Sequence, residues 1–289
     1  MNLSLSSSPS ATSVAVASSS SSPSSSATSW FSGIVRGRAD RSGNLKMAGN
    51  SGTGDGDSAC PIKGKNQFRG VLFKYGPKPI QDALEIDQLV SCLINKENSE
   101  GVVLLGHSTG CQDIVHYMRT NAACSRAVRA AILQAPVSDR EYRASLPETA
   151  AMIDLASTMI AKGRGSELMP READSSSPLT AYRYHSLCAY MGDDEMFSSD
   201  LSDDQLRTRL GHMCSTPCQV ICSMADEHVP EYVDKTALVE RLCRAMGGAE
   251  KVEIEHGNHS LSNRVDEAVQ AIIDFVKREG PKGWDDPWN

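Results

Sequence analysis

A serine at position 108 stands in a motif that could make it a nucleophile. The motif follows directly on the apolar run 101–105 and reads Gly106-His107-Ser108-Thr109-Gly110. Glycines on both sides of a serine permit a strained turn from a strand to a helix, which lifts the hydroxyl above the sheet. The first N–H groups of the helix favour an oxyanion beside it. The pattern predicts acyl transfer by Ser108, with the backbone N–H of Thr109 in the oxyanion hole; the alternative is a structural turn serine.

A serine nucleophile needs a histidine base, and that histidine needs a carboxylate to orient it. In sheets that carry this turn the chain order is serine, acid, histidine. Asp226 follows the strand-like segment 220–224, and His259 follows the alternating segment 251–255. Because α/β sheets place their chemistry at the carboxyl ends of the strands, we expect Asp226 to orient His259 and His259 to act as the general base for Ser108.

Two other histidines and one other carboxylate compete for these roles. His256 and His228 lie close by in the sequence, and a loop histidine is often no more than a solvated surface residue. The position after a strand and before a helix favours His259 over His256. Glu227 competes with Asp226, but Asp226 is the first carboxylate out of the strand.

Three segments resemble one known family. They are Leu105–Asp113, Leu133–Glu141 and Ser223–Glu227, and the first two are specific to it. The segments look like those of DUF1749, an α/β-hydrolase family of fungi and plants that includes a fungal siderophore esterase. The resemblance covers most of the chain from about residue 67. It implies an α/β-hydrolase fold with Ser108, Asp226 and His259 at the triad positions, and it leaves the substrate of plant members open.

The apolar spacing predicts alternating strands and helices, as in a doubly wound and mostly parallel sheet. Expected strands are 67–75, 102–105, 128–134, 218–224 and 251–255; expected helices are 83–93, 112–120, 148–162, 230–245 and 264–277. We expect a hydrolase domain over 67–289, with a cap inserted at about 139–210. Aromatic residues near 182–190 in that cap could line a pocket for the substrate or simply pack the cap.

One departure from the family concerns the oxyanion hole. In this fold a Gly-rich loop, a helix and a further strand lie between the early hairpin and the helix before the nucleophile strand. Here only the six residues Gly76–Gln81 separate Tyr75 from that helix, whereas the block needs roughly 40 to 60 residues. We therefore expect an incomplete sheet beside 102–105 and no second oxyanion donor.

The first 66 residues differ in composition from the rest. Sixteen of the first 32 residues are serine, no acidic residue precedes Asp40, and the segment carries six basic and three acidic groups. Such a segment does not bury enough apolar surface to fold by itself. We expect a disordered Ser-rich segment outside the fold that acts as a chloroplast transit peptide; the alternative is a tail without targeting value on a cytoplasmic protein.

Charge and cysteine content limit the partners. Residues 67–289 carry 23 basic and 33 acidic groups, which argues against nucleic acid as a partner. No apolar run approaches the ~18 residues of a membrane span. The nine cysteines are expected to be free thiols. Cys214, Cys218 and Cys222 recur every four residues, but Pro217 breaks the helix that would align them. We expect no metal and no other cofactor.

Three functions follow as hypotheses. The leading one is a serine esterase that acts on a small ester or a related acyl substrate. The second is a catalytically impaired, hydrolase-like binding protein, because the expected oxyanion hole is incomplete. The third is a truncated isoform that does not fold stably. The sequence identifies neither the acyl nor the alcohol group of a substrate.

Overall fold

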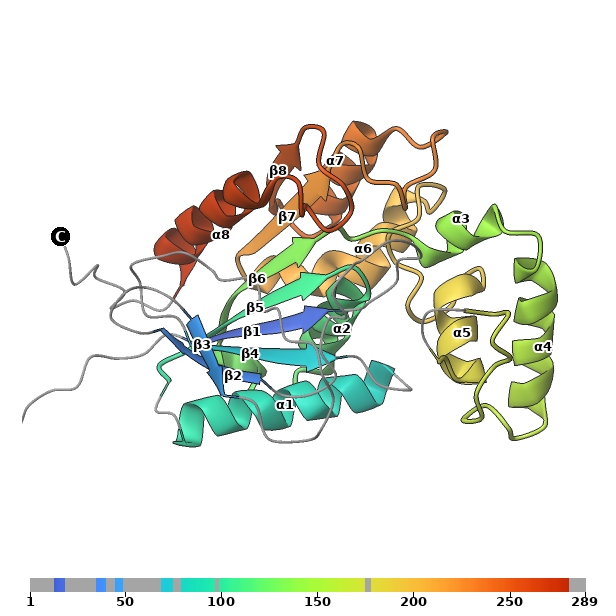
Figure 1. Ribbon diagram of the computed structural model, residues 1–289, viewed down its shortest axis with the longest axis horizontal. Helices are drawn as coiled ribbons and strands as arrows, with labels where there is room; N and C mark the ends of the chain where they lie inside the picture. Colours follow the sequence, from blue (N-terminus) through green and yellow to red (C-terminus); the bar gives the residue numbers. More distant parts are fainter. Residues whose placement is uncertain are drawn as a thin grey trace, which may run out of the picture.

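A single mixed sheet forms the centre of the molecule (Figure 1). The computed structural model describes the strands within 13–18, 35–39, 45–48 and 69–74, together with residues 79–96, 99–174 and 178–280. In this part of the chain the strand order is β3-β2-β4-β1-β5-β6-β7-β8. The strands are β1 (Ser13–Ser18), β2 (Val35–Ala39), β3 (Leu45–Ala48), β4 (Arg69–Lys74), β5 (Val102–His107), β6 (Val128–Gln134), β7 (Cys218–Ser223) and β8 (Glu250–Ile254).

Strand direction follows the doubly wound pattern. Neighbours from β4 through β1, β5, β6 and β7 to β8 pair in parallel, whereas β2 is antiparallel to both β3 and β4. Parallel strands of this kind are covered on both faces, so they read as apolar runs rather than as alternating ones. The predicted α/β-hydrolase fold class is confirmed.

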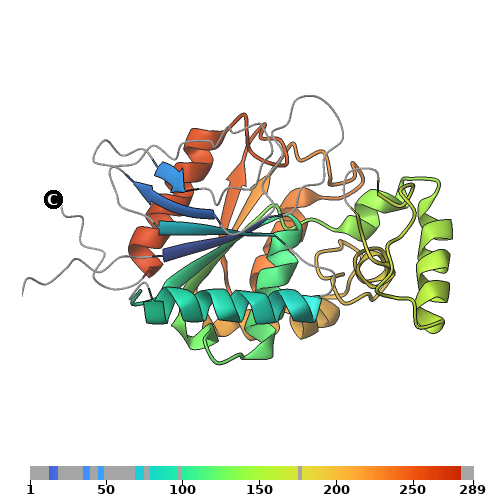
Figure 2. The same ribbon diagram turned by 60° about the horizontal axis from the view of Figure 1, so that its bottom comes forward.

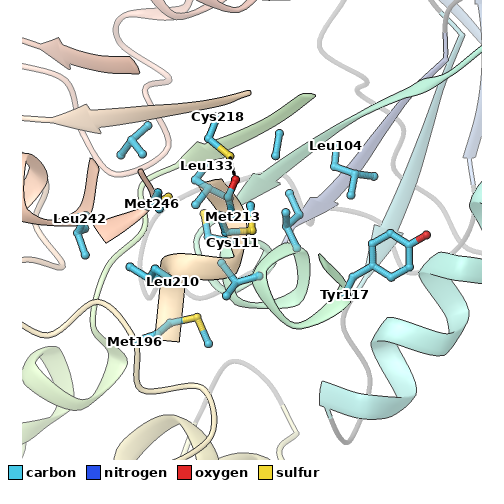
Figure 3. Close-up of a cluster of buried hydrophobic side chains, with 14 of the residues drawn as sticks. Leu104, Cys111, Tyr117, Leu133, Met196, Leu210, Met213, Cys218, Leu242 and Met246 are labelled. Atoms are coloured by element: carbon cyan, nitrogen blue, oxygen red, sulfur yellow. Dashed lines mark hydrogen bonds between the residues drawn. The ribbon is translucent and has the colours of Figure 1, made fainter. Parts of the chain in front are cut away.

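Helices cover both faces of the sheet. Their bounds are α1 (Pro79–Lys96), α2 (Thr109–Thr120), α3 (Asp139–Ala144), α4 (Thr149–Ala161), α5 (Ala181–Cys188), α6 (Asp203–Leu210), α7 (Lys235–Ala245) and α8 (Val265–Glu279), with short 3₁₀ turns at Ser125–Ala127 and Gly211–Ser215. Leu104 belongs to the larger core, which also contains buried residues of α1, α2 and α7 and is shown in part in Figure 3. Its neighbour Val103 packs toward Phe275 of α8 on the opposite face. The period-two alternation of the strand thus separates the two cores.

A helical cap stands beside the sheet. Figures 1 and 2 show α3, α4 and α5 as a lobe at one end of the molecule. The lobe has its own small core, in which Met159 of α4 packs with Tyr184 and Leu187 of α5. These three helices lie within residues 139–188, and the cap insertion expected at about 139–210 stays a prediction.

A buried cluster of charges ties the cap to the sheet domain. Arg183 of α5 forms ion pairs with Asp82 of α1, with Asp113 of α2 at 3.3 Å and with Asp194 at 2.9 Å, and all four side chains are fully buried. His116 of α2 contacts the second oxygen of Asp194 at 2.9 Å. Burial raises the pKa of Asp113 well above its usual range.

The strand beside the nucleophile strand comes from the N-terminal segment, which corrects two predictions. β1 lies between β4 and β5, with Val14 opposite both Gly70 and Val103. The expectations that residues 1–66 lie outside the fold and that the sheet is incomplete beside β5 are therefore wrong for this strand, and β2 and β3 also join the sheet. The signal was the short apolar alternation of residues 14–17 within a Ser-rich stretch. The remainder of residues 1–66 lies outside the described residues.

Candidate active site

Ser108 occupies a strained turn between β5 and α2. Its φ of 54° and ψ of −124° lie in a region that residues with a side chain rarely adopt. The preceding glycine makes the turn possible, because a Cβ on Gly106 would lie 2.4 Å from the carbonyl oxygen of Gly110. The backbone N–H of Ser108 donates to the carbonyl of Gln134 at the end of β6. These contacts give the local geometry that the motif predicts.

The structure brings the assigned acid and base together. The Nδ1 atom of His259 lies 2.9 Å from Oδ2 and 3.1 Å from Oδ1 of Asp226. Burial opposes the charge on Asp226, but contacts with the imidazoles of His228 and His259 outweigh it and hold the pKa of this carboxyl well below its usual range. An ionised carboxylate at Nδ1 keeps the proton of the neutral imidazole on that nitrogen.

The other nitrogen of the base is available. Nε2 of His259 is buried and has no hydrogen-bond partner among the residues that the structure describes. The His259 ring lies 5.0 Å, between ring centroids, from the ring of His107, the residue before the nucleophile. The base therefore lies beside the turn that carries Ser108.

The competing residues have different positions. Glu227 does not orient the imidazole; its carboxylate accepts a hydrogen bond of 2.8 Å from the backbone N–H of His259. His256 is exposed at a positive φ of 58°.

Lys235 of α7 donates to the backbone carbonyls of Met224 and Asp226, which fixes the loop after β7.

Gln134 joins the nucleophile turn to the base, a role that the sequence reasoning missed. Its side-chain amide donates a 2.9 Å hydrogen bond to the carbonyl of His259, and its side-chain oxygen accepts from Nδ1 of His107. This assigns the Nδ1–H tautomer to His107. Burial, together with the nearby His259, lowers the pKa of His107 to about 4, so this ring is neutral at pH 7. The position of Gln134 at the end of a strand was the available signal.

His228 is a second side chain whose position the sequence did not predict. Its ring lies between Tyr142 of the cap, at a centroid distance of 4.6 Å, and His259, at 4.1 Å. Its backbone N–H donates to Oδ1 of Asp226 at 2.8 Å, and its Nδ1 lies 3.7 Å from the same oxygen. Two histidines therefore share one buried carboxylate.

Thr109, whose backbone N–H is predicted to donate to an oxyanion, is buried and begins α2 directly after Ser108. β4 ends at Lys74 and α1 begins at Pro79, so the family's loop with a second donor has no room between them. Asp139, at the start of α3, accepts a 3.3 Å hydrogen bond from Gln112 of α2, and burial raises its pKa.

Comparison with known families decides the membership of the chain. The model of the family described as protein of unknown function (DUF1749) matches residues 75–280. The chain belongs to the DUF1749 family. An UPF0613 protein of Schizosaccharomyces pombe is 32% identical to this DUF1749 chain over 186 residues, 59% of this chain and 57% of that protein. The fusarinine C esterase sidJ of Aspergillus fumigatus is 31% identical over 202 residues, 50% of this chain and 53% of that protein. The chain thus spans just over half the length of these relatives.

Solved structures agree with the fold of this DUF1749 chain. The siderophore hydrolase EstB from Aspergillus fumigatus matches with a TM-score of 0.58 at 24% identity, covering 72% of this chain and 81% of that one. An α/β-hydrolase fold protein of unknown function matches with a TM-score of 0.55 at 20% identity, covering 75% and 79%. No helix among the described residues is long and apolar enough to cross a membrane.

Proposed function

We propose that this chain is a serine esterase in which Ser108 is the nucleophile, His259 the general base and Asp226 the residue that orients the base. The contact between Nδ1 of His259 and the buried carboxylate of Asp226 carries the proposal, because it leaves Nε2 as the proton acceptor. The strained backbone at Ser108 supports the assignment, since such strain clusters at functional sites. Homology to proteins named as esterases supports an ester as the substrate class.

The reaction proceeds in two halves. Nε2 of His259 takes the proton of Ser108 while the oxygen attacks the ester carbonyl, and the N–H of Thr109 donates to the resulting oxyanion. The imidazolium, stabilised by Asp226, then gives its proton to the departing alcohol. In the second half the same nitrogen takes a proton from water, which attacks the acyl-enzyme. The imidazolium then returns this proton to the Ser108 oxygen as the acid leaves, which restores the neutral base.

A binding protein of low activity is the second candidate. The short connection between β4 and α1 favours it, because the loop that holds the second oxyanion donor in the family has no counterpart there. Loss of one such donor typically lowers kcat about 100-fold to 1000-fold. The two candidates therefore differ in rate rather than in the residues of the site.

An active-site label separates the candidates. We expect a fluorophosphonate probe to modify Ser108 in the full chain, and we expect hydrolysis of p-nitrophenyl butyrate to fall to background in Ser108→Ala, His259→Ala and Asp226→Asn. His256→Asn is the matched control and should keep the parent rate. A folded chain that the probe does not modify favours the binding protein, and loss of activity in the His256 variant instead of the His259 variant refutes the assigned base.

A further inference from the structure

Asp226, His228 and His259 form a compact group of metal-ligand atoms. One donor atom from each of the three side chains lies within 4.8 Å of the other two, and all three residues are buried. Esterase chemistry uses Asp226 and His259 but gives no role to the imidazole of His228. Nδ1 of His228 is buried and has no hydrogen-bond partner in the described part of the chain. A buried nitrogen without a partner is unfavourable, and a ligand that it could bind would remove this cost.

The spacing of the donor atoms suits zinc. Oδ1 of Asp226 lies 3.1 Å from Nδ1 of His259 and 3.7 Å from Nδ1 of His228. Tetrahedral zinc holds nitrogen and oxygen ligands at about 2.0 to 2.2 Å, which places neighbouring ligands roughly 3.3 Å apart. The two distances bracket this value. Two imidazoles and one carboxylate are also among the usual protein ligands of zinc, and the fourth position is filled by water.

We propose that Asp226, His228 and His259 bind a zinc ion that switches the esterase off. Neutral His259 carries its proton on Nδ1, where Asp226 accepts it. Zinc takes the Nδ1 lone pair, so the proton moves to Nε2 while the metal gives up water molecules to solvent. No atom changes its oxidation state. Nε2 then donates instead of accepting, and Ser108 loses its base. The mechanism itself uses no metal; this ion is an inhibitor.

The proposed contact also engages the cap. The ring of His228 contacts both Tyr142 of α3 and His259. Coordination would hold these rings in their present order and so fix the cap residue beside the base. Zinc binding rests on the donor geometry alone, whereas inhibition rests on the proposed function.

Binding is tested without activity. Ser108→Ala keeps all three ligands, and isothermal titration of this variant with zinc chloride should show one binding site. In the double variant Ser108→Ala/His228→Phe the zinc affinity should fall at least tenfold, because loss of a metal-site partner typically costs about 10- to 100-fold in affinity. Phenylalanine retains the ring between Tyr142 and His259 and removes its nitrogens. Ser108→Ala/His256→Asn should bind zinc as the parent does, and Ser108→Ala/Asp226→Asn should bind weakly. Equal zinc binding in the His228→Phe background, or no binding in the parent, overturns the proposal.

Inhibition is tested in chains that retain Ser108. We expect zinc to inhibit ester hydrolysis and EDTA to restore it, and we expect His228→Phe, compared with and without zinc, to lose the inhibition. Inhibition that persists in His228→Phe overturns the assigned ligands. If the parent binds zinc at this site and hydrolyses no ester, the proposed function fails and the metal site stands. Circular dichroism shows whether the Asp226 and His228 variants fold. If they do not, the visible absorption of the parent chain with cobalt(II) tests the metal site, since a tetrahedral N/O site gives intense visible bands and an octahedral surface site does not.

Discussion

The side-chain amide of Gln134 donates a 2.9 Å hydrogen bond to the backbone carbonyl of His259, 125 residues further along the chain. The same side chain accepts from His107, and its backbone carbonyl accepts from the N–H of Ser108. One residue at the end of β6 thus contacts both the nucleophile turn and the loop of the base. These contacts link the turn at Ser108 to the loop of His259.

Gln134→Leu should lower both activity and stability. Leucine fills a similar volume but leaves the carbonyl of His259 and Nδ1 of His107 without partners, at a cost of about 1 to 3 kcal/mol for each buried group. We expect kcat for p-nitrophenyl butyrate to fall by about tenfold or more, since misplacement of a catalytic group by a fraction of an ångström is costly. Gln219→Leu in β7 is the control. It removes partly buried hydrogen bonds to Glu250 and Ala271 and should lower stability without lowering kcat. Equal effects on kcat contradict the role of Gln134.

Gly106→Ala should prevent the turn from forming. Its Cβ would lie 2.4 Å from a backbone oxygen and 2.8 Å from the backbone nitrogen of Cys111, neither of which is free to move. Soluble yield and labelling by fluorophosphonate should both be largely lost. Gly211→Ala is the control, because there the nearest atom would lie at an ordinary 3.5 Å and the backbone is helical. A stable, fully labelled Gly106→Ala chain would show that the turn is looser than described.

Arg183→Met should destabilise the chain strongly. It leaves Asp82, Asp113 and Asp194 buried together without their guanidinium, and removal of one partner from a buried ion pair typically costs about 3 to 5 kcal/mol. Urea unfolding monitored by circular dichroism measures the loss. The exposed pair of Arg164 with Glu167 supplies the control, and Arg164→Met should leave the midpoint unchanged. Similar midpoints for the two variants would contradict the view that this cluster holds the cap.

His107 should make the chain less stable in acid. Its pKa is about 4 in the folded chain and 6.5 when solvated, so the unfolded state takes up a proton first as the pH falls. The contribution of His107 is fully present above pH 6.5 and is lost between pH 6.5 and 4, with an upper limit of about 3 kcal/mol. His107→Asn keeps a donor for Gln134 and should flatten the fall in melting temperature over this range. His256→Asn should leave it unchanged, and a steep fall in His107→Asn would contradict the assignment.

The local parts of the site were predictable from the sequence. The turn at Ser108 depends on neighbouring glycines and a preceding strand, and the positions of Asp226 and His259 follow from the strands before them. The short helices α3, α5 and α6 were missed, although their capping residues were readable. Ser202 and Gln205 form a capping box at α6. The start of α7 was placed too early, at residue 230, because the helix begins at Lys235 with Asp234 as its N-cap.

Contacts between distant segments were not predictable in this way. Gln134 and His228 acquire their roles only when β6, the loop after β7 and the loop after β8 meet. β1 was missed because a short alternation of valine and alanine among serines has too little apolar surface to indicate a strand by itself. Pairing with β4 and β5 stabilises this strand. The sequence does not reveal that β4 and β5 leave a place between them for a third strand.

The position of β1 affects the order in which the protein can mature. A transit peptide is cleaved after import, yet Ser13–Ser18 lies in the interior of the sheet, with β4 on one side and β5 on the other. Cleavage anywhere between residue 18 and residue 66 would detach this strand from the chain. The cut chain would keep the strand only as a bound peptide, or else bring β4 and β5 together in a new register. Cleavage between residues 18 and 66 is thus incompatible with a continuous chain that contains the present strand order, and the mass of the mature chain tells whether such cleavage occurs.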